Sequence, residues 1–173
     1  MEDAIRLNLG CGSRVLEGWV NVDLVSRETT KKVKKEPEVV SDIRKLPFPD
    51  DYADEAMAIH VVEHFHVWEV PDLLREWIRV LKPGSPLIIE VPDLDKVISY
   101  MANGMKNPSF TMWPLYGDPS YCDPLMGHKW GYTPITLAKM MAHVGLKNIE
   151  RHQAQYHMKE QRDMRLVGYK DGD

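Results

Sequence analysis

Two glycines and an aspartate near the N-terminus have the spacing of a nucleoside-binding site. Gly10 and Gly12 follow the apolar run at residues 5–9, and Asp23 closes a second run at residues 20–24. Glycine adopts positive φ and lets a ligand reach backbone N–H groups without a Cβ in the way. A carboxylate at the end of the second strand can accept hydrogen bonds from ribose hydroxyls. The pattern therefore predicts a nucleoside site, although a simple strand-to-loop turn would need the same glycines.

A dinucleotide site of the nicotinamide type does not fit this segment. In the G-x-G-x-x-G pattern the third glycine would fall at position 15, which is Val15. The connection between Gly12 and Val20 is also too short for a crossover helix that begins at a pyrophosphate. The residues favour a nucleoside without a pyrophosphate.

A group of histidines supplies a second candidate for chemistry. His60, Glu63 and His64 match the H-x-x-E-H pattern of zinc peptidases. Such a site needs a helix, so that residues four apart share one face. Here residues 56–59 read as a strand that runs into His60, so we expect no metal site. Glu63 and His64 could instead cap a helix and pack, or His64 could lie at the mouth of the nucleoside site.

The elements that must position these residues alternate between strands and helices. Apolar runs bounded by turn residues predict strands, and apolar residues at helical spacing predict helices. The predicted strands are residues 5–9, 20–24, 39–43, 53–60, 86–91, 148–156 and 164–170, and the predicted helices are 71–81, 94–102 and 134–144.

This order predicts an α/β fold, an open and mostly parallel Rossmann-like sheet. The last two strands are joined too tightly for a crossover, so we expect an antiparallel pair at one edge. The chain has 173 residues, which fits one domain over residues 1–173.

A segment of unusual composition, residues 105–132, interrupts the alternation. Irregular, proline-stiffened segments with aromatic and methionine side chains can form the wall of a substrate pocket. We expect a substrate-side cap here, with His128 and Tyr132 meeting the substrate; a loop folded on its own apolar cluster and a homodimer contact are the alternatives. The segment contains Pro108, Pro114, Pro119, Pro124, Trp113, Tyr116, Tyr121, Trp130 and Tyr132.

Composition excludes several classes of protein. Lys and Arg number 22 against 26 Asp and Glu, a net charge of −4 that argues against broad nucleic-acid binding. Two cysteines cannot build a disulfide framework, and no stretch approaches the roughly 18 apolar residues of a membrane span. We expect a cytoplasmic protein without a membrane partner, with the lysines between residues 31 and 35 on a solvated face.

Several ordered segments resemble the class I S-adenosylmethionine-dependent methyltransferases, and among them a small, compact, single-domain branch of the type 11 kind. The segments are LNLGCG at 7–12, NVDL at 21–24, SDIRKLPF at 41–48, VVEHF at 61–65, VLKPGSPLIIEVP at 80–92 and HKWGYTP at 128–134. The resemblance implies S-adenosyl-L-methionine as cofactor. The cofactor-binding residues that it implies are Asn8, Gly10, Cys11, Gly12, Asp23, Asp42, Ile43, His60 and Val61.

The resemblance also has departures. Many members carry an acid where this chain has Asn8, and a glycine where it has Arg14. Asn8 brings no charge to the cofactor's amino group. A non-catalytic module that binds S-adenosylmethionine or a nucleoside is therefore the alternative to an enzyme.

The reaction that the resemblance implies is in-line displacement of a methyl group onto a hydroxyl or amine. A hydroxyl acceptor needs a general base, worth roughly 10²–10⁴-fold in rate. We expect His128 in this role, then His64, then Asp93 at the end of the fifth strand. A sugar, as in some members associated with glycans, or another small metabolite is the expected acceptor.

Overall fold

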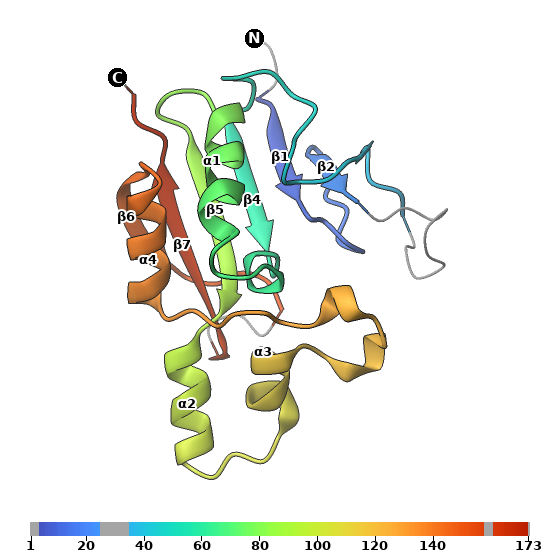
Figure 1. The fold of residues 1–173 in the computed structure, drawn as a ribbon, viewed down its shortest axis with the longest axis vertical. Helices are drawn as coiled ribbons and strands as arrows, with labels where there is room; N and C mark the ends of the chain where they lie inside the picture. The colour runs from blue at the N-terminus through green and yellow to red at the C-terminus, as the bar shows by residue number, and fades with distance from the viewer. Residues whose placement is uncertain (1–3, 25–34, 158–160, 173) are drawn as a thin grey trace.

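One seven-stranded sheet forms the centre of the molecule (Figure 1). The computed structural model describes residues 4–24, 35–157 and 161–172, so most of the lysines between 31 and 35 lie outside the described residues. The strands follow the order β3-β2-β1-β4-β5-β7-β6. They are β1 (Arg6–Leu9), β2 (Val20–Asp23), β3 (Val39–Val40), β4 (Glu55–Ile59), β5 (Pro86–Pro92), β6 (Lys147–His152) and β7 (Asp163–Tyr169).

The strand directions confirm the predicted fold class. Strands β1 to β5 are parallel, whereas β7 runs antiparallel to both β5 and β6. The antiparallel pair lies at one edge as expected, with β7 inside and β6 outermost. Leu9 is in register with both Val22 and Ala58, so the carboxyl ends of β1, β2 and β4 meet at one edge of the sheet. Strand β3 is shorter than expected, and Asp42 and Ile43 follow it in a loop.

Two helices, α1 (Val70–Val80) and α4 (Pro134–His143), cover one face of the sheet (Figure 1). The apolar stripe of α1 is buried, with Trp77 fully inaccessible, because its side chains repeat at helical spacing toward the core. Thr133 caps α4 in a reciprocal capping box with Thr136, which agrees with the predicted start of this helix. The main core lies between these helices and the sheet.

The opposite face of the sheet is covered by loops in the part of the chain that the structure describes. Strand residues on this face pack against side chains from the 10–19 connection and from residues 153–157. The shortened connection after β1 therefore does the covering that a helix does on the other face. The cluster contains Met57, Ile59, Ile88 and Val167, with Leu16, Trp19, Tyr156 and Tyr169 packed against it.

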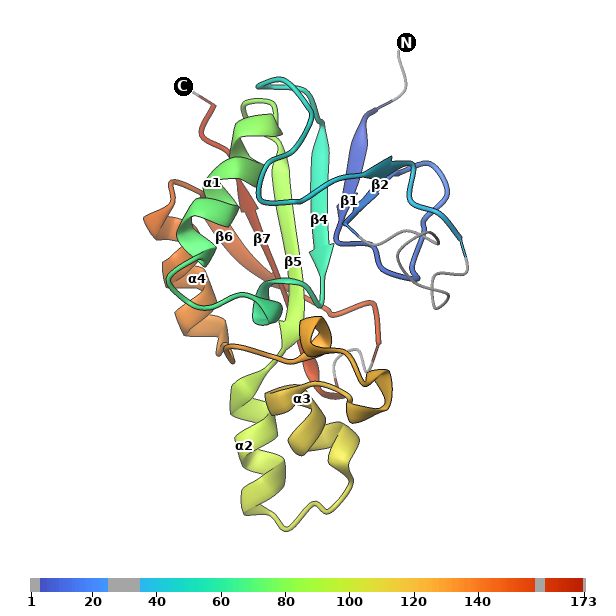
Figure 2. The ribbon, with the colours of Figure 1, turned by 45° about the vertical axis from the view of Figure 1, so that its right-hand side comes forward.

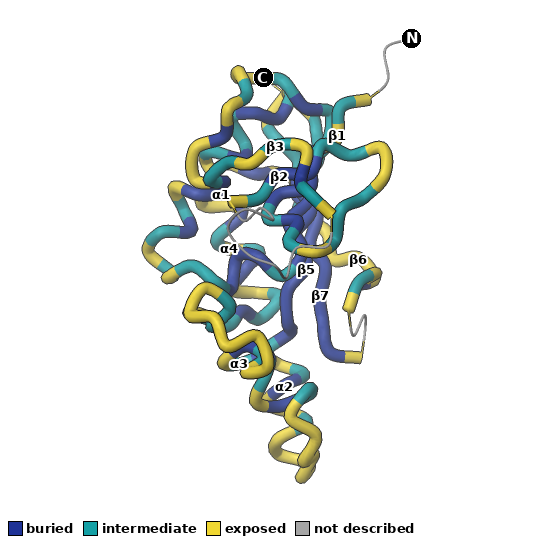
Figure 3. The backbone as a smooth tube through the Cα atoms, turned by 90° about the vertical axis from the view of Figure 1, so that its right-hand side faces the viewer, coloured by how far each residue is buried: buried dark blue, intermediate teal, exposed yellow. Residues whose placement is uncertain are grey.

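The polypeptide beyond the carboxyl ends of the strands forms the third part of the molecule (Figure 2). Helix α2 (Leu94–Ala102) leaves β5 there and is followed by α3 (Met112–Tyr116) and three 3-10 turns, η2 (Pro108–Phe110), η3 (Pro119–Tyr121) and η4 (Pro124–Met126). Much of this part is exposed (Figure 3). None of the helices in the described ranges is both long and apolar enough to cross a membrane.

Each 3-10 turn of this segment starts with the same side-chain cap. Asn107, Asp118 and Asp123 each precede a proline, and each side chain accepts a hydrogen bond from the backbone N–H two residues on. Proline presets φ for the first turn position, and the side-chain acceptor satisfies an otherwise unpaired N–H. The segment expected to be irregular is therefore a chain of short, individually capped turns.

Candidate active site

The glycine turn after β1 is built by two residues with positive φ. Gly10 has φ of 66° and Gly12 has φ of 52°, a region that favours glycine. The N–H groups of Gly10 and Cys11 both donate to the carbonyl oxygen of Val22, at 2.8 and 3.1 Å. These hydrogen bonds hold the turn at the carboxyl end of β2.

The two glycines have different surroundings. A Cβ on Gly10 would lie 2.7 Å from Val61 Cγ2, whereas a Cβ on Gly12 would meet no described atom within 4 Å. Gly10 is thus required by packing, and Gly12 leaves backbone open to an approaching ligand. This open, Cβ-free backbone fits a cofactor that binds through main-chain contacts.

Asp23 lies beside this turn, at the end of β2. Its Oδ2 accepts a 2.7 Å hydrogen bond from the Gly12 N–H. The structure therefore brings together the glycine turn and the carboxylate that the sequence proposes for the ribose.

Asn8, at the end of β1, and Cys11, within the turn, are both buried. Asn8 Nδ2 donates to the Arg14 carbonyl at 2.8 Å and to Asn21 Oδ1 at 2.7 Å, so this amide ties the 10–19 connection to β2. Burial, followed by the charges of Asp23 and Glu38, raises the pKa of the Cys11 thiol to about 12. The Cys11 thiol is therefore neutral and packs in the interior.

Asp42 and Ile43 occupy the loop after β3. Asp42 forms an ion pair with Arg44 at 2.7 Å, and hydrogen bonds from Arg44 lower the pKa of the Asp42 carboxyl. The Ile43 carbonyl accepts a 3.0 Å hydrogen bond from the indole N–H of Trp77 in α1. The core helix thus fixes the position of this loop.

His60 lies directly after β4 with an unusual backbone. Its φ is 55°, and its imidazole lies between two carboxylates, with Nδ1 2.9 Å from Glu63 Oε1 and Nε2 3.1 Å from Asp163 Oδ2. Burial lowers the pKa of His60, but the hydrogen bonds and charges of the two carboxylates outweigh it and raise the pKa to about 9. His60 is therefore an imidazolium at neutral pH. Asp163 was not expected from the sequence: its only signal is an acid that opens an apolar strand.

The segment after His60 is a 3-10 turn, η1 (Val62–His64), rather than the α-helix that an H-x-x-E-H zinc site needs. Glu63 is buried, and its carbonyl oxygen accepts hydrogen bonds from the N–H groups of Lys129 and Trp130, at 2.7 and 3.3 Å. These bonds fasten the end of the 105–132 segment to η1.

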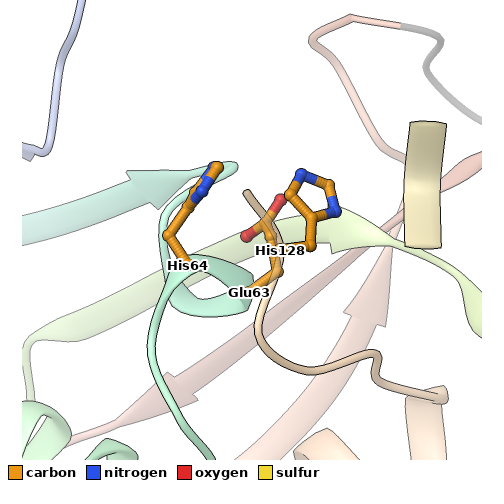
Figure 4. A group of neighbouring side chains, drawn as sticks. All are labelled: Glu63, His64 and His128. Carbon is orange, nitrogen blue, oxygen red and sulfur yellow. The ribbon is translucent and has the colours of Figure 1, made fainter. Parts of the chain in front are cut away.

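His64 and His128 come together as a result. Their ring centroids are 4.8 Å apart with an interplanar angle of 90°, and the carboxylate of Glu63 lies between the two rings (Figure 4). His128 Nδ1 lies 2.8 Å from the carbonyl oxygen of Pro114. Burial lowers the pKa of His128, although the charge of Glu63 opposes the shift. The first two of the expected bases are thus neighbours.

Asp93 is placed differently. Its Oδ1 accepts from the Asp95 N–H at 3.1 Å, which caps α2, and its Oδ2 forms a 2.9 Å ion pair with Arg151. The geometry favours a helix cap and ion-pair partner over the base role predicted from the sequence.

A shallow cavity of about 310 Å³ opens within the 105–132 segment itself. Its lining includes Met112, Trp113 and Tyr116. His128 is connected to the same segment, because its N–H donates to the Tyr116 carbonyl at 3.3 Å. One backbone hydrogen bond thus links His128 to α3, which contributes aromatic residues to this cavity.

Comparisons with known proteins agree with this geometry. A family model described as "Methyltransferase domain" matches residues 7–89. The ubiquinone/menaquinone biosynthesis C-methyltransferase UbiE of Cupriavidus taiwanensis is 28% identical over 120 residues, which cover 66% of this chain and 48% of that protein. The chain thus spans about half the length of this curated relative.

Solved structures show the same fold. A SAM-dependent methyltransferase from Archaeoglobus fulgidus superposes with a TM-score of 0.66 at 19% identity, covering 96% of this chain and 86% of its own. A second, from Methanosarcina mazei, has a TM-score of 0.66 at 16% identity and coverages of 100% and 95%. Residues 7–89 match the methyltransferase-domain family, and they include the glycine turn and Asp23. The chain has the fold of the S-adenosylmethionine-dependent methyltransferases, whose methyl donor is S-adenosyl-L-methionine.

Proposed function

We propose that this protein transfers a methyl group from S-adenosylmethionine to a hydroxyl or amine of a small-molecule acceptor. One observation carries the proposal: Val61 packs against the glycine turn, and its carbonyl accepts a 3.0 Å hydrogen bond from the His64 N–H. The nucleoside-binding turn and the histidine pair are thus joined through a single residue at the carboxyl edge of the sheet, where α/β folds bind ligands.

The cofactor half of this site would use backbone more than side chains. The backbone at Gly12, which carries no Cβ and has open space around it, offers close approach, and Asp23 offers a carboxylate to the ribose hydroxyls. Asp42 and Ile43 lie in the loop proposed to border the adenine, while His60 and Val61 border the methionine end. Asn8 would act from below, by holding the turn in place.

The acceptor half would be formed by the histidine pair and the cap at residues 105–132. S-adenosylmethionine supplies an electrophilic methyl group when bound, so the chain's main tasks are to orient the acceptor and to help remove its proton. His128 donates through Nδ1 to the Pro114 carbonyl, which leaves Nε2 as its basic atom. His128 and His64 are the groups that we propose activate the acceptor.

The cap gives the basis for proposing an acceptor class. Trp113, Tyr116 and Met112 line the cavity within the cap, and flat aromatic faces suit a sugar ring or another small metabolite. The relative UbiE is named a C-methyltransferase, so carbon nucleophiles belong in the acceptor panel as well.

Calorimetry with S-adenosylmethionine, followed by turnover on a panel of hydroxyl, amine and carbon acceptors, tests the proposal. We expect binding with one site per chain and methylated product from at least one acceptor. His128→Ala should lower turnover by about 10²-fold or more while cofactor affinity stays the same. Binding without product from any acceptor would favour the non-catalytic module, and no binding would overturn both functions.

A further inference from the structure

Buried polar atoms around Glu63 lack partners. Glu63 is 1% exposed, and its Oε2 and His64 Nδ1 have no hydrogen-bond partner among the residues that the structure describes. The buried hydroxyl of Tyr132 likewise has no hydrogen-bond partner among the described residues. An unpaired buried polar group destabilises the folded state, and a native site that contains several of them points to a bound ion or water.

The three side chains nearest to one another have the geometry of a ligand set. One ligand atom each from Glu63, His64 and His128 lies within 4.8 Å of the other two, and Figure 4 shows the carboxylate between the imidazoles. Metal–nitrogen and metal–oxygen bonds of about 2.0–2.2 Å place the ligands of a tetrahedral ion about 3.4 Å apart. An ion would draw the three atoms together by up to about 1.4 Å, from 4.8 Å to that spacing, and His64 is the partly buried member whose Nδ1 lacks a partner among the described residues.

The hydrogen bond to Pro114 fixes His128 in the tautomer that can bind a cation. A carbonyl oxygen only accepts, so the 2.8 Å contact with Pro114 requires a proton on Nδ1 and leaves the lone pair on Nε2. Metal-binding histidines characteristically donate their other N–H to a carbonyl or carboxylate, which fixes the tautomer and the ring orientation. Glu63 is held in a comparable way, since its Oε1 is ion-paired with His60 at 2.9 Å.

His60 itself does not belong to the set. Both of its ring nitrogens are engaged, by Glu63 and by Asp163. The ligands therefore differ from those of the H-x-x-E-H pattern: two come from η1, and the third comes from the far end of the cap. A site of this kind is not visible as a local sequence motif.

We propose that Glu63, His64 and His128 bind one divalent transition-metal ion of the zinc class. Two imidazoles and one carboxylate suit this ion, and three protein ligands leave a coordination position open. The ion joins η1 to the end of the cap, in addition to the backbone bonds from Lys129 and Trp130 to the Glu63 carbonyl.

The open position has a consequence that rests on the proposed function. An acceptor hydroxyl bound there loses its proton to solvent more readily, because the cation stabilises the alkoxide. The oxygen then forms a bond to the methyl carbon as the carbon–sulfur bond of the donor breaks, which releases S-adenosylhomocysteine and the methyl ether. Through the ion, His64 and His128 activate the acceptor without accepting the proton themselves.

Cobalt binding in the absence of S-adenosylmethionine tests the site. The chelator-treated full chain is titrated with CoCl₂ and followed by visible absorption, and ZnCl₂ binding is measured by calorimetry. We expect one ion per chain and the intense d–d bands of four-coordinate Co²⁺. His64→Ala and His128→Ala should each weaken binding by more than the about 10–100-fold typical of an outer-shell change.

His66→Ala is the matched control, since His66 is exposed and only two residues from His64. This variant should bind cobalt as the unaltered chain does. The proposal is overturned if cobalt does not bind stoichiometrically, or if binding survives both His64→Ala and His128→Ala. Absent metal binding with intact S-adenosylmethionine binding rejects only the metal site, whereas the reverse result rejects only the proposed function.

Discussion

Val61 occupies the space that a side chain on Gly10 would need, because a Cβ there would lie 2.7 Å from Val61 Cγ2. This contact brings the glycine turn after β1 against the segment after β4. Val61 also begins the turn that carries Glu63 and His64. The packing of one glycine thus sets the distance between the cofactor and acceptor halves of the proposed site.

Gly10→Ala should destabilise the fold strongly. A positive φ costs a non-glycine residue about 1–2 kcal/mol, and overpacking against Val61 adds about 1–3 kcal/mol. The free energy of unfolding, measured with urea, should fall by about 2–5 kcal/mol. Combining Gly10→Ala with Val61→Ala should recover part of the overpacking cost; a double variant with a purely additive loss would contradict the contact.

Gly12→Ala is the matched comparison, because it shares the positive φ but has open space around the new methyl group. Its unfolding free energy should fall by only about 1–2 kcal/mol. Affinity for S-adenosylmethionine, measured by calorimetry, should fall at least about 10-fold, since the methyl group enters the proposed ligand space. Equal stability losses for the two glycine variants would contradict the tighter packing at Gly10 than at Gly12.

Asp23→Asn tests the carboxylate proposed for the ribose. Asparagine keeps an oxygen that accepts from the Gly12 N–H but loses the charge that strengthens hydrogen bonds from ribose hydroxyls. Hydrogen bonds to charged groups contribute about 1.5–3 kcal/mol, so affinity for S-adenosylmethionine should fall about 10–100-fold. Asp72→Asn, at a side chain 87% exposed on α1, is the control and should bind normally. Unchanged affinity in Asp23→Asn would remove Asp23 from the site.

The parts of this fold that the sequence predicts are those that depend on local patterns. Apolar runs that end at glycine, proline or aspartate locate the strands, and Thr133 followed by Pro134 locates the start of α4. The end of β3 is not predictable from local patterns. The strand stops at Val40, because the residues after it form a loop that Trp77 of α1 holds through a hydrogen bond. No local pattern contains that hydrogen bond.

The candidate site shows the same limit more clearly. The glycine turn and Asp23 are predictable because parallel strands bring their carboxyl ends to one edge. The pairing of His64 with His128 is not, because it depends on backbone hydrogen bonds from Lys129 and Trp130 to Glu63 across the whole cap. Asp163 was missed for a similar reason: its role exists only where β7 brings it to His60.

Trp77→Phe should loosen the loop that follows β3. Trp77 is fully buried, and its indole N–H is hydrogen-bonded to the Ile43 carbonyl at 3.0 Å. Phenylalanine removes the donor and leaves a small void, so the unfolding free energy should fall by about 2–4 kcal/mol. Trp68→Phe, at a residue 70% exposed, should change it by less than about 0.5 kcal/mol. A similar stability for the two variants would contradict the role of this hydrogen bond.

Cys11 should behave as an inert thiol despite its position in the turn. With a pKa raised to about 12 by burial and by the nearby carboxylates, its thiolate fraction at pH 8 is about a thousandfold below that of a free cysteine. Cys122 is exposed, so Cys122→Ser isolates the reaction of Cys11 with iodoacetamide. In this variant alkylation of the folded chain should be slow at pH 8 and should become fast in urea.

The raised pKa of Cys11 also makes the stability of the fold depend on pH. The unfolded chain loses the Cys11 proton near pH 9 and the folded chain only near pH 12, so the folded state binds more protons between these values. Its contribution to the unfolding free energy is therefore complete below about pH 9 and declines as the pH rises toward 12. Cys11→Ala should remove this decline, which urea titrations at pH 8 and 10 would measure. Equal pH dependence in the two chains would contradict a raised pKa of Cys11.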